Sequence, residues 1–331
     1  MAGLVDLVAE AGRQLSICNA CRYCEGYCAV FPAAERRPAF TLGDVVQLAN
    51  LCHDCRACYQ ACMFAPPHEF AVDVPDLMGR VRLAAYRHYA WPGALGALLD
   101  RPRLAAALAG LGGTLLALLA AIWSHGPGSL ARAHTGPGAF YQLIGYELLL
   151  AAFLVLTALV VLVLGVGSRR LWRDLGGARP QLGPRAWVGA LADVLRLRYL
   201  GGGGGGCYHP DPLRPSQARR VLHQLLFGGF VLAFAATLAA AVEQDLLGWL
   251  PPYPVLSPPV LLGIAGGVAM VAGAGGLLWL KARAAPAGLD SRRLDLAFLW
   301  LSEVVGVSGL ALLALRATPL IGPLLVLHLG A

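Results

Sequence analysis

The chain has 331 residues, of which 57% are hydrophobic and only 14% are charged. A soluble domain normally carries about 25% charged residues, so the composition argues against a soluble protein and indicates one that lies in a lipid bilayer. The formal net charge is +7, but no nucleic-acid-binding motif accompanies it, and the sequence predicts no nucleic acid partner.

Residues 1–100 are the polar part of the chain and contain eight of its nine cysteines. These eight cysteines fall into two runs with the same spacing, C-x2-C-x2-C-x3-C. The runs are Cys18, Cys21, Cys24 and Cys28, followed by Cys52, Cys55, Cys58 and Cys62. Such a duplicated run is typical of a ferredoxin-like domain that holds two [4Fe–4S] clusters.

The fourth cysteine of each run is expected to ligate the other cluster, as it does in two-cluster bacterial ferredoxins. The first cluster then takes Cys18, Cys21, Cys24 and Cys62, and the second takes Cys52, Cys55, Cys58 and Cys28. Two alternatives fit these residues less well. Structural zinc usually uses cysteine pairs separated by a longer spacer, and disulfides are rare in the reducing cytosol.

Five apolar segments in the rest of the chain are each long enough to cross a hydrocarbon core of about 30 Å. They are Leu104–Trp123, Ala139–Gly167, Val221–Val242, Ser257–Leu280 and Leu296–Leu315. A sixth segment, Pro319–Ala331, reaches only about 20 Å as a helix and cannot span alone. The sequence therefore predicts an all-α membrane helical bundle of five to six transmembrane helices over residues 101–331, preceded by the iron–sulfur domain of residues 1–100.

The distribution of arginine predicts the orientation of these helices. Residues 167–220 contain ten arginines, whereas residues 124–138 contain only Arg132 and residues 243–256 contain no basic residue. Because basic loops stay in the cytoplasm, the long loop of residues 167–220 and the N-terminal domain are expected on the cytoplasmic side of a bacterial-type inner membrane. The run Gly201–Gly206 in this loop predicts a flexible linker, and Cys207 beside it is expected to lie outside the clusters.

Two histidines are candidates for the axial ligands of a b-type haem, which a helical bundle supplies from facing helices. His223 lies just inside the third apolar segment, and His328 lies within the last one. For His223 an interfacial position beside Arg219 and Arg220 is the alternative. For His328 a functional role is favoured, because polar groups buried in a membrane are usually functional.

Several stretches together resemble the tricarballylate utilisation protein B family, and the likeness covers nearly the whole chain. They are "CNACRYCEGYCAVFPAAERR", "LANLCHDCRACYQACMFAPPHEFAVDVP", "HTGPGAFY", "CYHP" and "APAGLDSRRLDLAF". The resemblance implies a membrane partner of a flavin-dependent dehydrogenase that oxidises tricarballylate to cis-aconitate. It implies that electrons pass from reduced FAD in that partner, through two [4Fe–4S] clusters and haem b, to the quinone pool.

The resemblance implies an electron-transfer subunit rather than a catalytic one, and the sequence leaves open whether the chain is itself an enzyme. A second hypothesis is a membrane-anchored iron–sulfur redox sensor or assembly factor that reports a redox state without turnover.

Overall fold

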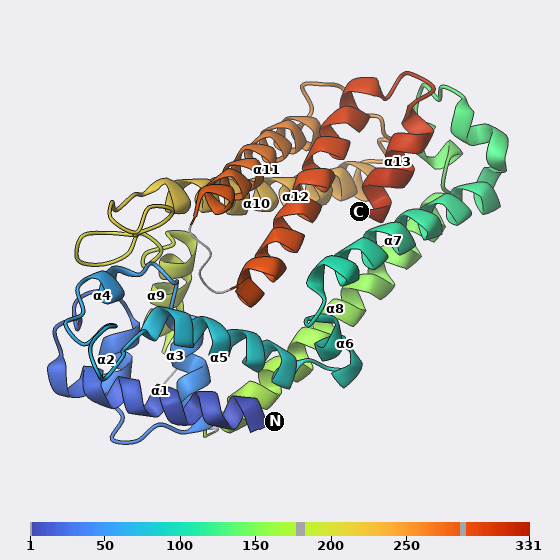
Figure 1. The fold of residues 1–331 in the computed structure, drawn as a ribbon. Helices are drawn as coiled ribbons and strands as arrows, with labels where there is room; N and C mark the ends of the chain where they lie inside the picture. The colour runs from blue at the N-terminus through green and yellow to red at the C-terminus, as the bar shows by residue number, and fades with distance from the viewer. Residues whose placement is uncertain (1, 177–182, 285–288) are drawn as a thin grey trace. The chain divides into compact units, whose positions relative to one another are not determined.

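The structure is a computed structural model that describes residues 2–176, 183–284 and 289–331 (Figure 1). Within these ranges the chain forms helices and no strand, which confirms the predicted all-α class. The chain divides into two compact units. The first comprises Met1–Arg101, Leu162–Val221 and Trp279–Asp295, and the second comprises Pro102–Val161, Leu222–Leu278 and Leu296–Ala331.

The first unit contains shorter helices, and four of them supply most of the residues of one apolar core. The shorter helices are α1 (Ala2–Cys21), α2 (Val30–Glu35), α3 (Leu42–Leu51), α4 (Ala57–Gln60), α5 (Val74–Tyr89), α6 (Gly93–Leu98) and α9 (Pro184–Leu195). Leu15 of α1, Leu48 of α3 and Leu77 and Met78 of α5 are at most 1% exposed in this core. Burial of each such side chain stabilises the fold by about 1.5–3 kcal/mol. Five cysteines of the two runs pack against the edge of this core, so its packing fixes their positions.

Side-chain caps determine where α3 and α5 begin. The backbone N–H of Asp44 donates to the Thr41 hydroxyl at 3.2 Å, and the N–H of Thr41 donates back to Asp44 at 3.0 Å. This reciprocal capping box satisfies two N–H groups that have no partner within the helix. Asp73 accepts from the N–H of Asp76 at the start of α5, and its own N–H donates to Gln14 of α1 at 3.0 Å. The hydrogen bond from Asp73 to Gln14 therefore joins the start of α5 to α1.

Within the described ranges, five helices are long and apolar enough to cross a membrane. They are α7 (Pro102–His125), α8 (Tyr146–Asp174), α10 (Ala218–Ala241) with the π-helical turn Val242–Leu246, α11 (Pro258–Arg283) and α12 (Leu289–Leu315). The prediction of five long apolar helices is thus confirmed. The second helix starts later than expected, at Tyr146 rather than Ala139, because Ala139–Gln142 forms a separate 3₁₀ turn that follows Gly138 at a φ of 78°.

The sixth apolar segment forms α13 (Ile321–Gly330), which is too short to cross a bilayer. It packs closely on α7, since a Cβ atom added to Gly113 would lie only 2.3 Å from the carbonyl oxygen of Gly330. The core beside this contact contains Ala121, Ile321 and Leu325. The last segment is therefore a half-length helix held against the bundle.

Glycines allow α11 to pack between α10 and α12. A Cβ at Gly273 of α11 would lie 2.4 Å from the backbone nitrogen of Leu226 in α10, and one at Gly266 would lie 2.7 Å from that of Ala233. On the neighbouring face, a Cβ at Gly267 would lie 2.9 Å from Leu310 of α12. Small residues at helix crossings are typical of membrane bundles, where close backbone approach supplies much of the attraction.

Candidate metal centre

The first cysteine run begins on the last turn of α1. Cys18 and Cys21 are three residues apart on that helix and so share one face. The helix stops at Cys21 because Arg22 adopts a positive φ of 56°, and the backbone N–H of Arg22 donates to the carbonyl oxygen of Cys18 at 2.8 Å. This turn directs the chain back toward the same side, where Cys24 follows.

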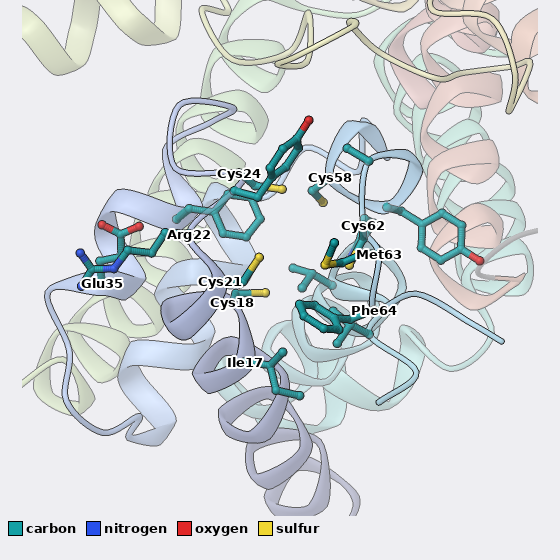
Figure 2. A pocket seen from close by; sticks show the side chains of 17 residues that line it. Ile17, Cys18, Cys21, Arg22, Cys24, Glu35, Cys58, Cys62, Met63 and Phe64 are labelled. Carbon is teal, nitrogen blue, oxygen red and sulfur yellow. The ribbon is translucent and has the colours of Figure 1, made fainter. Parts of the chain in front are cut away.

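These thiols line a cavity of about 480 Å³. Figure 2 shows the sulfur atoms of Cys18, Cys21 and Cys24 on one side of it and that of Cys62, which comes from the second run, on the other. Cys58 also borders the cavity. Its remaining walls are mainly apolar or aromatic and include Ile17, Phe31, Tyr59, Phe64 and Val74.

The second run is positioned by the end of α3 and by α4. Cys52 directly follows α3, Cys58 lies on α4, and Cys62 lies two residues beyond it. Two residues with positive φ flank Cys55, namely Asp54 at 50° and Arg56 at 59°. The chain therefore winds tightly between its first and third cysteines.

The thiols raise one another's pKa values, both within the two predicted groups of four and between them. Burial raises the pKa of Cys18 to about 12, and the nearby thiols of Cys62, Cys24 and Cys21 add to the increase. Burial also raises the pKa of Cys58, with further contributions from Cys52, Cys55, Cys24 and Cys28.

The same pattern holds for other members of the second group. Burial raises the pKa of Cys52 to about 12, and Cys28 is among the groups that raise it further. Burial raises the pKa of Cys28 as well, where Cys55 adds to the effect and hydrogen bonds from the backbone of Val30 and Phe31 oppose it. The structure thus brings the eight cysteines of the two runs together, with Cys24 and Cys58 near members of both predicted groups, and their division between two clusters stays a prediction.

The geometry bears on the two alternatives for these cysteines. All nine cysteines lie in the described ranges and none forms a disulfide. Among the described residues, no three His, Cys, Asp or Glu side chains converge closely enough to share one metal ion, as the tetrahedral ligands of a zinc ion do. Thiols spread around a cavity suit a polynuclear cluster, in which each thiolate binds a different iron atom.

Arginines surround the second run. Arg82 of α5 donates to the carbonyl oxygens of Cys52 and, at 3.1 Å, of Ala49. Arg219 donates to the carbonyl oxygen of Asp54 at 2.9 Å. Positive charge at these positions favours the anionic state of any cluster bound by the neighbouring thiols. The cysteine spacing contains no signal for either arginine, so neither can be predicted from it as part of the metal centre.

The glycine run also differs from its expectation. Gly201–Gly206 was predicted to be a flexible linker, but a Cβ at Gly203 would lie 2.1 Å from the carbonyl oxygen of Tyr27. Cys207 is fully buried, and the N–H of Tyr208 donates to the carbonyl oxygen of Cys55 at 2.8 Å. The linker prediction is wrong, because glycine allows close packing as well as flexibility.

The two predicted haem ligands lie on different helices of the second unit. His223 is partly buried near the start of α10. His328 lies on α13, where its Nδ1 is 3.1 Å from the Ser308 hydroxyl and its ring packs on Gly309 of α12. Two axial imidazoles from separate helices are what a haem in a bundle needs, and ligation of haem by this pair stays a prediction.

Comparison with known proteins shows which protein family the chain resembles. The sequence profile of the citrate utilization protein B Fer4-like domain matches residues 11–88, and that of citrate utilization protein B matches residues 98–331. A curated relative from Escherichia coli, named citrate utilization protein B, is 42% identical over 330 residues, which are 99% of this chain and 86% of the relative. No solved structure matches the chain. The matches support an N-terminal iron–sulfur domain, and their names refer to citrate rather than to tricarballylate.

Proposed function

This chain belongs to the citrate utilization protein B family, and we propose that it is a membrane-bound electron-transfer subunit. In this proposal it reoxidises a partner FAD-dependent dehydrogenase and passes the electrons, through two [4Fe–4S] clusters and haem b, to the quinone pool. The partner's substrate is a tricarboxylate, with tricarballylate and its oxidation to cis-aconitate as the first reaction to test.

The observation that carries the proposal is the interleaving of the two cysteine runs. Cys62 of the second run faces Cys18 of the first run across the cavity (Figure 2), and Cys28 of the first run is near Cys52 and Cys55 of the second, which supports the proposal. This exchange of the fourth cysteine is the arrangement of two-cluster ferredoxins. We assign Cys18, Cys21, Cys24 and Cys62 to one cluster and Cys28, Cys52, Cys55 and Cys58 to the other.

Two such clusters, when bound, supply one-electron transfer without chemistry on a substrate. The residues of this chain determine the polarity and the charge around each cluster site. Apolar side chains such as Ile17 and Phe64 line the cavity of the first group, and Arg82 and Arg219 place positive charge beside the second. Hydrogen bonding, local charge and solvent exposure are the variables by which a protein adjusts cluster potentials. The chain therefore provides two different environments for two similar sites.

In this proposal the electron path ends in the membrane, at haem b and quinone. The five long apolar helices support insertion in the bilayer, and the excess of arginine in residues 167–220 supports a cytoplasmic position for that loop and for the N-terminal domain. We assign His223 and His328 as the haem b ligands, since both lie on apolar helices of one unit. We therefore propose an inner-membrane location with the N-terminus in the cytoplasm.

Metal analysis of protein purified without oxygen tests the proposal directly. We expect about eight iron and eight sulfide per chain, because two [4Fe–4S] clusters contain that number. Two iron atoms, or bound zinc, would contradict it. Reduction of the clusters by the reduced flavoprotein, followed by their reoxidation with a quinone analogue, separates an electron carrier from a redox sensor, which would show no turnover.

A further inference from the structure

The segment Leu200–Arg219, which we name the cap, lies against the second cysteine run within the first unit. Figure 1 shows this yellow loop beside α4. The N–H of Tyr208 donates to the carbonyl oxygen of Cys55 at 2.8 Å, and the N–H of Ser216 donates to that of Cys207 at 2.8 Å. Leu200 is 5% exposed and Cys207 is fully buried. The cap is therefore a packed structure with its own closing hydrogen bond.

The cap also contacts the first cysteine run, at the residue that precedes Cys28. A Cβ at Gly203 would lie 2.1 Å from the carbonyl oxygen of Tyr27, and one at Gly204 would lie 2.6 Å from the Tyr27 ring. Only glycine allows the two backbones to approach this closely. Since Cys28 and Cys55 both belong to the second group, the cap touches that group from two sides.

Arg219 places a positive charge at the same point. Its guanidinium donates to the carbonyl oxygen of Asp54 at 2.9 Å. The carboxyl of Asp54 has its pKa raised by burial, and the charges of Arg219, Arg56 and Arg82 act in the opposite direction. The cap therefore brings an arginine to the peptide next to Cys55.

The first cysteine group has no such cover. Cys21 is exposed, and Tyr23 and Met63 at the edge of its cavity are 67% and 74% exposed. None of the residues that line this cavity comes from the cap. The two groups thus differ in the exposure of one cysteine, Cys21, and in nearby positive charge, and exposure and charge are among the properties that change a cluster potential.

We propose that the cap shields the second [4Fe–4S] site from solvent. We also propose that the positive charge of Arg219 raises the reduction potential of this site above that of the first. The inference rests on the proposed function, since it concerns clusters that the two groups bind. The positive charge of Arg219 favours the more negative reduced state of the second site, whereas exclusion of water acts in the opposite direction, so in this proposal the charge gives the electron path its direction, from the first site to the second.

Thiol labelling of the native protein tests the cover. With eight cysteines bound to iron, Cys207 is the one remaining thiol, and a maleimide reports whether the cap is open. We expect no label on the native wild type and one label on Gly203→Ala, whose new Cβ displaces the cap from Tyr27. The control is Gly79→Ala in α5, where a Cβ meets nothing within 4 Å, and it should stay unlabelled.

The outcomes distinguish a failure of the cap proposal from a failure of the proposed function. Rapid labelling of Cys207 alone in the wild type, with eight iron retained, overturns the cap while the clusters stand. Labelling of all nine cysteines in a protein without iron overturns the proposed function itself. If Gly203→Ala yields no folded protein, the wild-type result and the arginine variants below still decide the question.

Redox titration followed by electron paramagnetic resonance tests the role of Arg219. Arg219→Gln should lower the potential of the second site, which is the signal that Cys55→Ser abolishes, and leave the first unchanged. We expect about a tenfold change in the reduction equilibrium, equivalent to about 59 mV for one electron. Arg214→Gln removes the same charge from an exposed position of the cap and should change neither potential. No shift in Arg219→Gln, or equal shifts of both sites, overturns the assignment.

Discussion

Arg22 and Arg56 occupy the same position in the two cysteine runs, directly after the second cysteine, and both adopt a positive φ, of 56° and 59°. The two runs therefore share a left-handed residue at this position, although Cys21 ends a helix and Cys55 lies between two left-handed residues. For a residue with a Cβ atom this left-handed conformation costs about 1–2 kcal/mol. Its presence at both equivalent positions indicates that the turn is required to bring the third cysteine of each run back toward the first.

The first prediction concerns this turn. Arg22→Gly should retain a full content of iron, because glycine adopts a positive φ without a penalty. Arg22→Val should lose iron at a lower temperature, since a β-branched residue is strongly disfavoured there. Loss of cluster absorbance on heating is the measurement. Arg36→Val is the matched control, because Arg36 is exposed and has a φ of −74°, and a loss there as large as in Arg22→Val contradicts the argument.

The second prediction concerns the exchange of the fourth cysteines. Cys62→Ser should remove or alter the same spectroscopic signal as Cys18→Ser, although the two residues belong to different runs. Cys28→Ser should alter the signal that Cys52→Ser alters. Each variant is expected to keep about four of the eight iron atoms if the other cluster stays intact. Electron paramagnetic resonance of the reduced proteins is the measurement, and a Cys62→Ser signal that matches Cys52→Ser instead shows that each run holds its own cluster.

The sequence predicted the helices well where the residues of the helix itself determine its formation. Leu104–Trp123 and Ser257–Leu280 differ from α7 and α11 by a few residues at each end, because an uninterrupted apolar run of this length can satisfy its backbone in a membrane only as a helix. The start of the second helix was wrong because Gly138 and the 3₁₀ turn after it interrupt an apolar stretch without changing its hydropathy.

The metal centre was predictable in its cysteines but not in its surroundings. The spacing of the runs pointed to two groups, because each run repeats the same three close thiols and a fourth. Arg82, Arg219 and Tyr208 reach the second group from far along the chain, and contacts of this kind leave no periodicity in the sequence. Gly203 was misread for a related reason, since a glycine needed for close approach looks the same as one in a linker.

The third prediction concerns haem. Reduced protein should show a low-spin b-type spectrum, and His223→Ala or His328→Ala should diminish it. Ser308→Ala should keep haem but shift its absorption, because the 3.1 Å contact with Nδ1 orients the His328 ring and such contacts adjust a metal ligand without replacing it. His125→Ala, at the end of α7, serves as the control. A wild-type protein without a Soret band means that electrons leave the clusters for quinone directly.

The fourth prediction concerns packing in the membrane unit. Gly273→Ala should destabilise the bundle by about 1–3 kcal/mol, the usual effect of overpacking, because its Cβ would lie 2.4 Å from the nitrogen of Leu226. Gly263→Ala on the same helix places a Cβ 3.9 Å from Ala236, an ordinary contact, and should have little effect. Thermal unfolding in detergent, followed by helical circular dichroism, compares the two. Equal stability of both variants would show that α10 and α11 do not pack this closely.

The position of the cap in the sequence means that it is synthesised after the cysteines that it covers. Both cysteine runs emerge from the ribosome before α7 and α8, and Leu200–Arg219 emerges only after these two helices. At a synthesis rate of about 5–20 residues per second, the interval is on the order of ten seconds. During it, Cys28 and Cys55 lack the segment that later covers them. Insertion of the first two helices into the bilayer therefore falls between the synthesis of the cysteines and the closure of their cover, and a chain arrested in that interval presents an open site to the iron–sulfur assembly machinery and to oxygen alike.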